Sequence, residues 1–121
     1  MNPLIWVAVM LIGGTGSVLR FLVDRAVSHR ARRPFPLGTM AVNVSGAALQ
    51  GFVAGLALSA VTGLLAGVAF VGAYSTFSTW MLETQRLGEE RRPGAAAANI
   101  VLTSTLGLGA AAAGIWMAKQ W

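Results

Sequence analysis

One stretch of 49 residues carries no charged side chain; it spans residues 34–82 and reads PFPLGTMAVNVSGAALQGFVAGLALSAVTGLLAGVAFVGAYSTFSTWML. A transmembrane helix takes roughly 20 apolar residues, each advancing about 1.5 Å. The stretch is therefore long enough to cross a bilayer twice, and we predict that it folds back near residues 59–63. A soluble helical hairpin this apolar would need a more polar segment to cover it, and the sequence offers none.

The remainder of the chain is also poor in charge. Only 11% of the 121 residues are charged, 55% are hydrophobic, and the mean hydropathy is +0.66. Soluble domains have about 25% charged residues, and disordered chains are far less apolar than this one. Because the chain has no cysteine, a disulfide scaffold and a thiolate metal site are excluded. The sequence predicts an all-α membrane protein built as one domain over residues 1–121.

The spacing of the charged clusters predicts four transmembrane helices. They cover approximately residues 3–22, 37–58, 62–82 and 95–118, with charged loops at 23–36 and 83–94. The first helix lacks the basic leading region of a secretory signal peptide. With four crossings, both termini lie on one side of the membrane and both charged loops lie on the other.

Basic residues are distributed very unevenly between these two sides. The termini contribute only Lys119, whereas the loop side carries Arg25, Arg30, Arg32, Arg33, Arg86, Arg91 and Arg92, with Arg20 close by. Positive residues prefer the cytoplasm, so we expect cytoplasmic loops and external termini. A basic rim beside anionic lipid accounts for the net charge of +5, and we expect no nucleic-acid partner.

Small residues recur at four-residue spacing, which places both members of a pair on one helix face. The pairs are Gly13/Ser17, Gly51/Gly55, Gly63/Gly67 and Ala110/Gly114. Such pairs let helix backbones approach closely in lipid, so we predict close packing within a bundle or a dimer. Four helices scarcely surround a pathway, and we therefore expect an oligomer.

Polar side chains form stripes on two of the apolar segments. One stripe on the second segment comprises Thr39, Asn43, Gly46 and Gln50, and the fourth segment carries Asn99 and Thr103 on one face. An amide in hydrocarbon needs a hydrogen-bond partner. These stripes serve either interhelical packing or a solute path lined with neutral donors.

The third segment contains VGAYSTFSTW at residues 71–80, which is a poor plain membrane helix. Its hydroxyl cluster after Gly72 predicts local unwinding, and freed carbonyls at membrane depth are able to hold a monovalent cation. Phe77 and Trp80 share a face, where they either pack in the core or offer ring edges of partial positive charge. Neutral donors suit an anion that must be released. Arg20 either attracts anions at a vestibule or snorkels to the interface.

Three motifs in order along the chain resemble those of the Fluc (CrcB) fluoride channels of microbes. They are Gly13-Gly14-Thr15-Gly16-Ser17 followed by Arg20; Pro36-Leu37-Gly38-Thr39 through Asn43 and Gly46; and Gly72 through Ser75-Thr76-Phe77-Ser78-Thr79, with Glu83 beyond. The second and third motifs are specific, and the resemblance covers nearly the whole chain.

The resemblance implies passive export of fluoride through a prokaryotic inner membrane. It implies an antiparallel, dual-topology dimer with two fluoride pathways and a structural Na⁺ at its centre. By resemblance, the fluoride pathway comprises Asn43, Phe77, Ser78, Thr79, Trp80 and Thr103. The carbonyls of Gly72 and Ser75 would match the sodium site, and Arg20 and Glu83 match family-typical positions without an assigned role.

Two departures from the family pattern lead to a more specific hypothesis. Trp80 stands where the motif has phenylalanine, and its indole adds bulk and an N–H donor. The charge bias does not suit a homodimer inserted in both orientations. Both departures fit one half of a heterodimer with a homologous, oppositely oriented subunit.

The residues also bear on three other functions. A non-conducting accessory subunit is the main alternative, and a small four-helix multidrug exporter is another. Such exporters carry a glutamate in the first helix, which has no internal acid here. An intramembrane hydrolase is not expected, because His29 lies in the basic loop and no acid–base pair is visible. The sequence predicts that the chain is not an enzyme.

Overall fold

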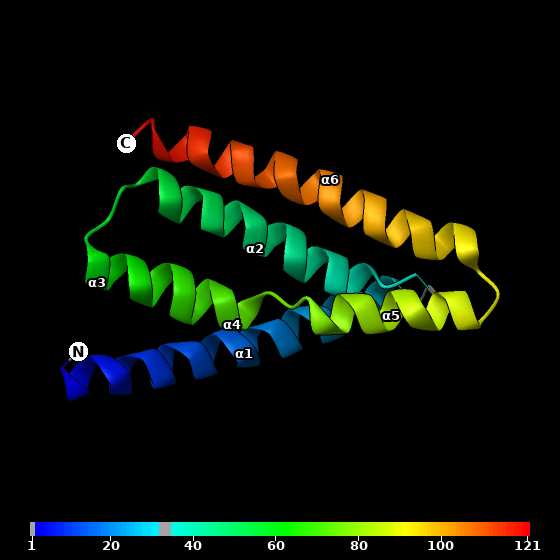
Figure 1. Cartoon of the computed structure of the whole chain (residues 1–121), viewed down its shortest axis with the longest axis horizontal. Coiled ribbons are helices and arrows are strands. Elements are labelled where there is room, and N and C mark those ends of the chain that lie inside the picture. Colours follow the sequence, from blue (N-terminus) through cyan, green and yellow to red (C-terminus); the bar gives the residue numbers. More distant parts are fainter. Residues whose placement is uncertain (1, 32–34) are drawn as a thin grey trace.

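The chain forms long helices that run side by side, as the computed structural model shows for residues 2–31 and 35–121 (Figure 1). The elements are α1 (Pro3–Ala31), α2 (Leu37–Gly55), α3 (Ala60–Gly63), η1 (Leu64–Val71), α4 (Gly72–Tyr74), α5 (Ser78–Glu89) and α6 (Pro93–Ala118). Four helical stretches are long and apolar enough to cross a membrane, and α3 to α5 together form the third of them. The predicted all-α architecture with four membrane-spanning helices is confirmed.

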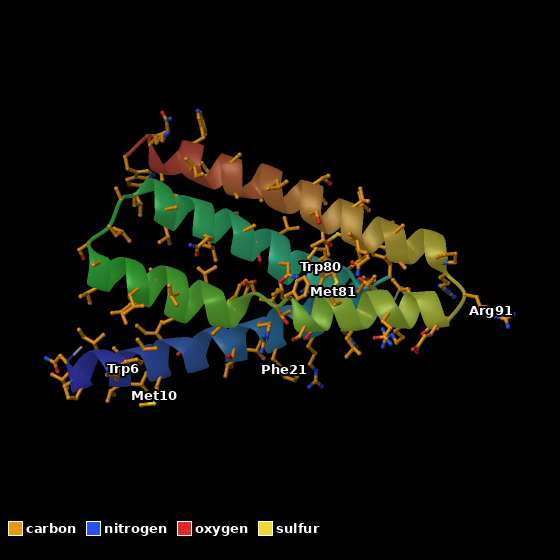
Figure 2. The ribbon with its side chains drawn as sticks, viewed as in Figure 1. Trp6, Met10, Phe21, Trp80, Met81 and Arg91 are labelled. Atoms are coloured by element: carbon orange, nitrogen blue, oxygen red, sulfur yellow. The ribbon has the colours of Figure 1, made fainter. Side chains whose placement is uncertain are left out.

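The ends of the helices gather at two opposite ends of the bundle. Both termini and the α2–α3 turn lie at one end of the bundle, and the α5–α6 turn lies at the other (Figure 1). Apolar side chains point outward along α1, where Trp6, Met10 and Phe21 are exposed, while Arg91 marks the charged end (Figure 2). Such exposed apolar faces are typical of helices that contact lipid or another subunit.

Two helices extend well beyond the predicted bounds. α1 continues to Ala31 and α5 continues to Glu89, so the predicted loops at 23–36 and 83–94 are largely helical. Charged residues end a membrane span, but arginine and glutamate are good helix formers and do not end a helix. Residues 32–34 of the predicted first loop lie outside the described residues.

The turn between the second and third spans comes earlier than predicted. α2 ends at Gly55, and Ala57 then adopts a positive φ of 51°. Ser59 caps the next helix, because its Oγ accepts a hydrogen bond of 3.3 Å from the Thr62 N–H. The third span therefore begins at Ala60, within the region where the turn was expected.

Small residues bring α2 and α6 into backbone contact. A Cβ on Gly51 would overlap the carbonyl of Ala111, and a Cβ on Gly114 would overlap the carbonyl of Ala48. The predicted pair Gly51/Gly55 therefore mediates close packing, as does Gly114 of the pair Ala110/Gly114.

The other two predicted pairs differ. Gly63 has nothing within 4 Å of an added Cβ. On α1 the closest approach is at Gly16, whose added Cβ would lie 2.6 Å from the Phe70 carbonyl oxygen, whereas Gly13 has ordinary spacing. The tight contact therefore involves Gly16 and not the Gly13/Ser17 pair.

The third span is broken near its middle, as predicted. α4 ends at Tyr74, Ser75 is extended (φ −81°, ψ 159°), and α5 begins at Ser78. The break follows Gly72 by one short helical turn, and Gly72 itself is helical. Before the break the chain forms a π-helix, η1, in which the Gly72 N–H donates to the carbonyl of Gly67, five residues earlier.

Candidate functional site

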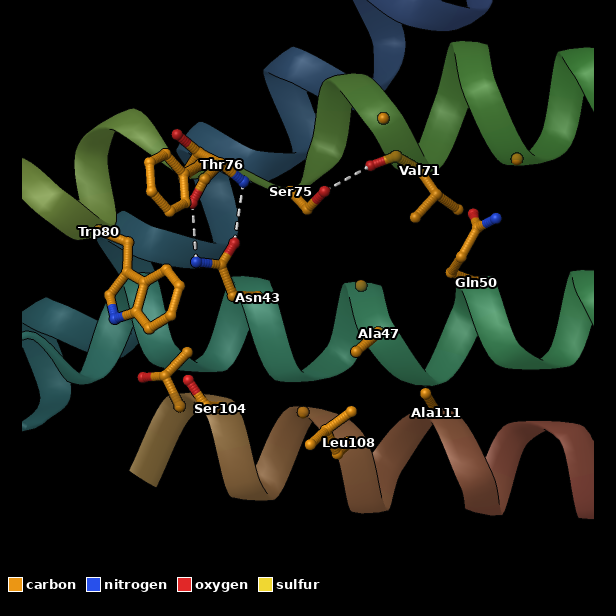
Figure 3. A pocket seen from close by; sticks show the side chains of 16 residues that line it. Asn43, Ala47, Gln50, Val71, Ser75, Thr76, Trp80, Ser104, Leu108 and Ala111 are labelled. Carbon is orange, nitrogen blue, oxygen red and sulfur yellow. Dashed lines mark hydrogen bonds between the residues drawn. The ribbon is translucent and has the colours of Figure 1, made fainter. Parts of the chain in front are cut away.

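The break in the third span opens onto a groove of about 770 Å³ between α2, η1–α4, α5 and α6 (Figure 3). The groove is lined by six of the residues selected from the sequence, namely Asn43, Gly72, Ser75, Phe77, Trp80 and Thr103. Gln50, Ser104 and Leu108 also line it. Residues from three separate spans therefore converge on the broken segment.

The side-chain amide of Asn43 clamps the broken backbone. Its Nδ2 donates to the Thr76 carbonyl at 2.8 Å, and the Thr76 N–H donates to its Oδ1 at 2.8 Å (Figure 3). Asn43 is able to make both bonds, because its side-chain amide offers an N–H donor and a carbonyl acceptor. Asn43 thus satisfies the two backbone groups that the break releases at Thr76.

This clamp has a consequence for Gly72. In an α-helix the Thr76 N–H would donate to the Gly72 carbonyl, four residues earlier. Here that N–H donates to Asn43 instead. The Gly72 carbonyl is therefore released from its helical partner beside the groove. The neighbouring Ser75 hydroxyl donates back to the Val71 carbonyl at 3.0 Å, so its side chain stabilises the end of α4.

The two aromatic residues of the motif face each other edge to face. The rings of Phe77 and Trp80 are 5.8 Å apart and inclined at 86°. Phe77 is 70% exposed. The Trp80 indole N–H donates to the Asn99 carbonyl on α6 at 3.2 Å. The extra donor expected from tryptophan is thus engaged by α6, and Trp80 presents its ring to the groove.

Ser78, Thr79 and Arg20 do not line this groove. Thr79 and Arg20 line a second cavity of about 210 Å³ beside α1, together with Asp24. Ser78 is exposed, and its hydroxyl lies 3.4 Å from that of Thr76. Thr76 borders both cavities.

Glu83 and Thr103 each contact a buried partner. The hydroxyl of Thr39, which is 2% exposed, donates to the half-buried Glu83 carboxyl group. Thr103 is 5% exposed and its hydroxyl lies 3.5 Å from Oδ1 of the fully buried Asn99. Thr39 was placed on the Asn43 stripe from spacing alone, and its hydroxyl points instead toward α5.

Two residues that contribute to the site were not selected from the sequence. Thr76 is part of the third motif, but it contributes to the site through its backbone, which no side-chain pattern reveals. Tyr74 is buried, and its hydroxyl lies 2.8 Å from that of Ser45 on α2. Its position directly before the hydroxyl cluster was the available signal, because a buried tyrosine hydroxyl needs a partner.

No group of three or more histidine, cysteine or acidic side chains is close enough to hold a metal ion in residues 2–31 and 35–121. The polar side chains that line the groove are amides and hydroxyls, and aliphatic residues such as Val71 and Leu108 lie beside them.

Comparison with known proteins shows the family of the chain. A family model described as "CrcB-like protein, Camphor Resistance (CrcB)" matches residues 7–115. The chain belongs to the CrcB family. Among its CrcB relatives, the fluoride-specific ion channel FluC 2 of Mycobacterium tuberculosis (strain ATCC 25618 / H37Rv) is 65% identical over 115 residues, which cover 95% of this chain and 91% of that protein.

Other CrcB relatives carry similar names. The FluC 2 protein of Mycolicibacterium paratuberculosis is 68% identical over 115 residues, covering 95% of this chain and 94% of the relative. The fluoride-specific ion channel FluC 1 of Leifsonia xyli subsp. xyli is 42% identical over 123 residues, which cover 97% of this chain and 88% of that protein. These CrcB relatives are ion channels by name and not enzymes. Family membership and four spanning helices identify a multi-pass, non-enzymatic membrane protein.

Proposed function

We propose that this chain is a subunit of a passive, fluoride-selective channel that exports cytoplasmic fluoride across a prokaryotic cell membrane. The names of the relatives support fluoride as the ion. The observation that carries the proposal is the Asn43–Thr76 clamp beside the edge-to-face pair of Phe77 and Trp80 in the groove. The CrcB match speaks against the multidrug exporter.

The chemistry of the groove suits a small anion in transit. A primary amide nitrogen carries two hydrogens, and Asn43 uses one of them on the Thr76 carbonyl. The other is available to an anion. The exposed ring of Phe77 offers edge hydrogens of partial positive charge. Neutral donors replace hydration without holding the ion as tightly as a buried cation would.

The second part of the proposal is an antiparallel dimer. Phe77 is a large apolar side chain, and it is 70% exposed at the mouth of the groove. An apposed subunit would cover it and complete the walls of a pathway. The strong charge bias of this chain favours external termini and cytoplasmic charged ends. This bias, with relatives numbered FluC 1 and FluC 2, supports a heterodimer with a homologous, oppositely oriented subunit.

The third part is a structural Na⁺ at the centre of the dimer. The released carbonyl of Gly72 fits such an ion, because oxygen donors without a helical partner are what a hard cation requires. Gly72 and Ser75 would provide carbonyl oxygens from the break. When bound, the ion would supply a fixed positive charge that links the broken helices of the two subunits.

Fluoride efflux from liposomes that contain the purified chain tests this function, with chloride efflux as the control. Fluoride-selective efflux from the chain alone supports a homodimeric channel. If well-folded protein gives no efflux, the assay is repeated with a homologous subunit of opposite charge bias added. Selective efflux only in the mixture supports the heterodimer, and no efflux in either case contradicts the channel.

A second candidate is an accessory subunit whose own pathway does not conduct. Trp80 favours it, because its indole is larger than the phenylalanine of the motif and is bonded to α6 beside the groove. Replacing Trp80 by phenylalanine separates the two. An accessory subunit would gain fluoride efflux in the Trp80→Phe variant, whereas a conducting subunit would already show it.

A further inference from the structure

Trp80, Thr84 and Asn99 form a closed ring of hydrogen bonds between α5 and α6. The Thr84 hydroxyl donates to the Trp80 carbonyl at 2.9 Å, and it accepts from Nδ2 of Asn99 at 2.9 Å. The Trp80 indole N–H closes the ring by donating to the backbone carbonyl of Asn99 at 3.2 Å. One of these bonds lies within α5, and the other two join α5 to α6.

The position of Thr84 determines how the Asn99 amide is oriented. A hydroxyl has one hydrogen, and Thr84 gives it to the Trp80 carbonyl. The Thr84 oxygen therefore offers only lone pairs to Asn99 and accepts a hydrogen bond from its Nδ2. The Oδ1 of Asn99 then faces the Thr103 hydroxyl, 3.5 Å away. Because Asn99 is fully buried, an amide in any other orientation would leave unpaired polar atoms.

The same ring fixes a side chain in the wall of the groove. Trp80 lies in the first turn of α5, directly after the non-helical residues 75–77, so α5 alone provides little support for a ring of this size. Its bond to α6 and its edge contact with Phe77 hold the indole from two sides. The wall that faces Asn43 is thus held in place by α6.

We infer that Thr84 is a positioning residue that holds the Trp80 indole in one orientation in the groove wall, and thereby sets how well the groove discriminates between anions. The effect on discrimination rests on the proposed fluoride channel, whereas the orientation of the indole does not. A residue at position 84 without a hydroxyl would lose both bonds and would open the ring of hydrogen bonds that joins α5 to α6 beside the indole.

The test uses protein labelled with 5-fluorotryptophan and reads the ¹⁹F resonance of Trp80, assigned with the Trp80→Phe variant. In Thr84→Val we expect the Trp80 resonance to shift and broaden, because valine keeps the shape of threonine but removes the hydroxyl. The ratio of fluoride to chloride efflux should fall about fivefold, the effect of losing one hydrogen bond. Thr84→Ser should restore both.

Thr105→Val is the matched control, because the Thr105 hydroxyl also bonds back to its own helix, but both of its acceptors, the carbonyls of Val101 and Leu102, are on α6. An unchanged Trp80 resonance in Thr84→Val would overturn the inference. A changed resonance with an unchanged efflux ratio would overturn the role in discrimination. If even the unmodified protein passes no fluoride with its partner, the channel proposal fails, and the resonance still decides whether Thr84 holds Trp80.

A measurement on the unmodified protein covers the case in which Thr84→Val does not fold. The indole N–H of Trp80 should exchange with solvent much more slowly than that of Trp121, which is 91% exposed. Equal exchange rates would contradict a fixed indole.

Discussion

The Asn43 side chain and the backbone N–H and C=O of Thr76 form two hydrogen bonds of 2.8 Å, one in each direction. The amide of one helix therefore takes the place of the peptide partners that the broken helix has lost. At membrane depth no water is available to take that place. The broken segment and Asn43 consequently form one structural unit.

Removing the amide should destabilise the protein and stop transport. Asn43→Leu leaves two backbone groups of Thr76 unpaired, so we expect thermal unfolding in detergent to show a loss of about 2–4 kcal/mol and fluoride efflux to disappear. Asn43→Asp keeps the acceptor for the Thr76 N–H but carries a negative charge. It should retain more stability than Asn43→Leu and still show no efflux. Leu49→Ala, exposed on the same helix, is the control for stability and transport.

The aromatic edge of Phe77 should be needed for transport but not for folding. Phe77→Ile keeps an apolar side chain and removes the ring hydrogens. Because Phe77 is 70% exposed, stability should change little, while fluoride efflux should fall by about tenfold or more. Phe21→Ile, at a 59% exposed position on α1, should leave efflux unchanged. Equal efflux in both variants would show that the ring of Phe77 does not face the ion.

The contact between α2 and α6 should tolerate no added methyl group at Gly114. In Gly114→Ala the new Cβ overlaps the Ala48 carbonyl, so the helices must separate, at a cost of about 1–3 kcal/mol in unfolding free energy. Gly109→Ala lies on the same helix with open space around its Cβ. It should be neutral or stabilising by up to about 1 kcal/mol. A similar loss in both variants would argue against the tight contact.

The bond between Thr39 and Glu83 should depend on the hydroxyl and not on the shape of the side chain. Thr39→Val removes the donor from a half-buried carboxyl group, and we expect unfolding free energy to fall by about 1–3 kcal/mol. Thr39→Ser keeps the donor and should lose much less. If serine and valine destabilise equally, the methyl group of Thr39 is what matters.

The orientation in the membrane is directly measurable, because the chain has no cysteine of its own. Single cysteines at Gln120 and Glu89 lie at opposite ends of the bundle. An impermeant thiol reagent added to intact cells should label Gln120→Cys and spare Glu89→Cys, because the arginines are concentrated at the Glu89 end. Equal labelling of both would show that the chain inserts in both orientations.

Much of the fold is readable from the sequence, because membrane helices are specified by apolar length and small residues. The uncharged stretch at 34–82 predicted the second and third spans, and the hydroxyl cluster predicted the break. Charge patterns failed to locate the helix ends, since α1 continues to Ala31 through its charged segment. The tight contact at Gly16 was also missed, because neighbouring glycines on α1 offer several equally plausible pairs.

The site was predicted less completely than the fold. Spacing placed Asn43 on a polar face, and the structure brings it to the break. Spacing did not separate Phe77 and Trp80 at the groove from Thr79 at the second cavity, because the broken backbone changes the direction of successive side chains. Thr76 takes part through its peptide group, whose partners depend on the neighbouring span.

The π-helical turns of η1 also determine in which direction the side chains after them point. Each residue of an α-helix rotates the chain by about 100°. A stretch of i to i+5 hydrogen bonds takes up an extra residue locally, so the residues after it keep the direction that they would have in an uninterrupted α-helix. Deleting one residue from Leu64–Val71 would let η1 rewind as an α-helix, and the break would keep its orientation toward α2, so that Thr76 still faced Asn43. The chain should therefore tolerate a one-residue deletion in η1, where its composition is almost featureless, better than the same deletion in an α-helical part of the span.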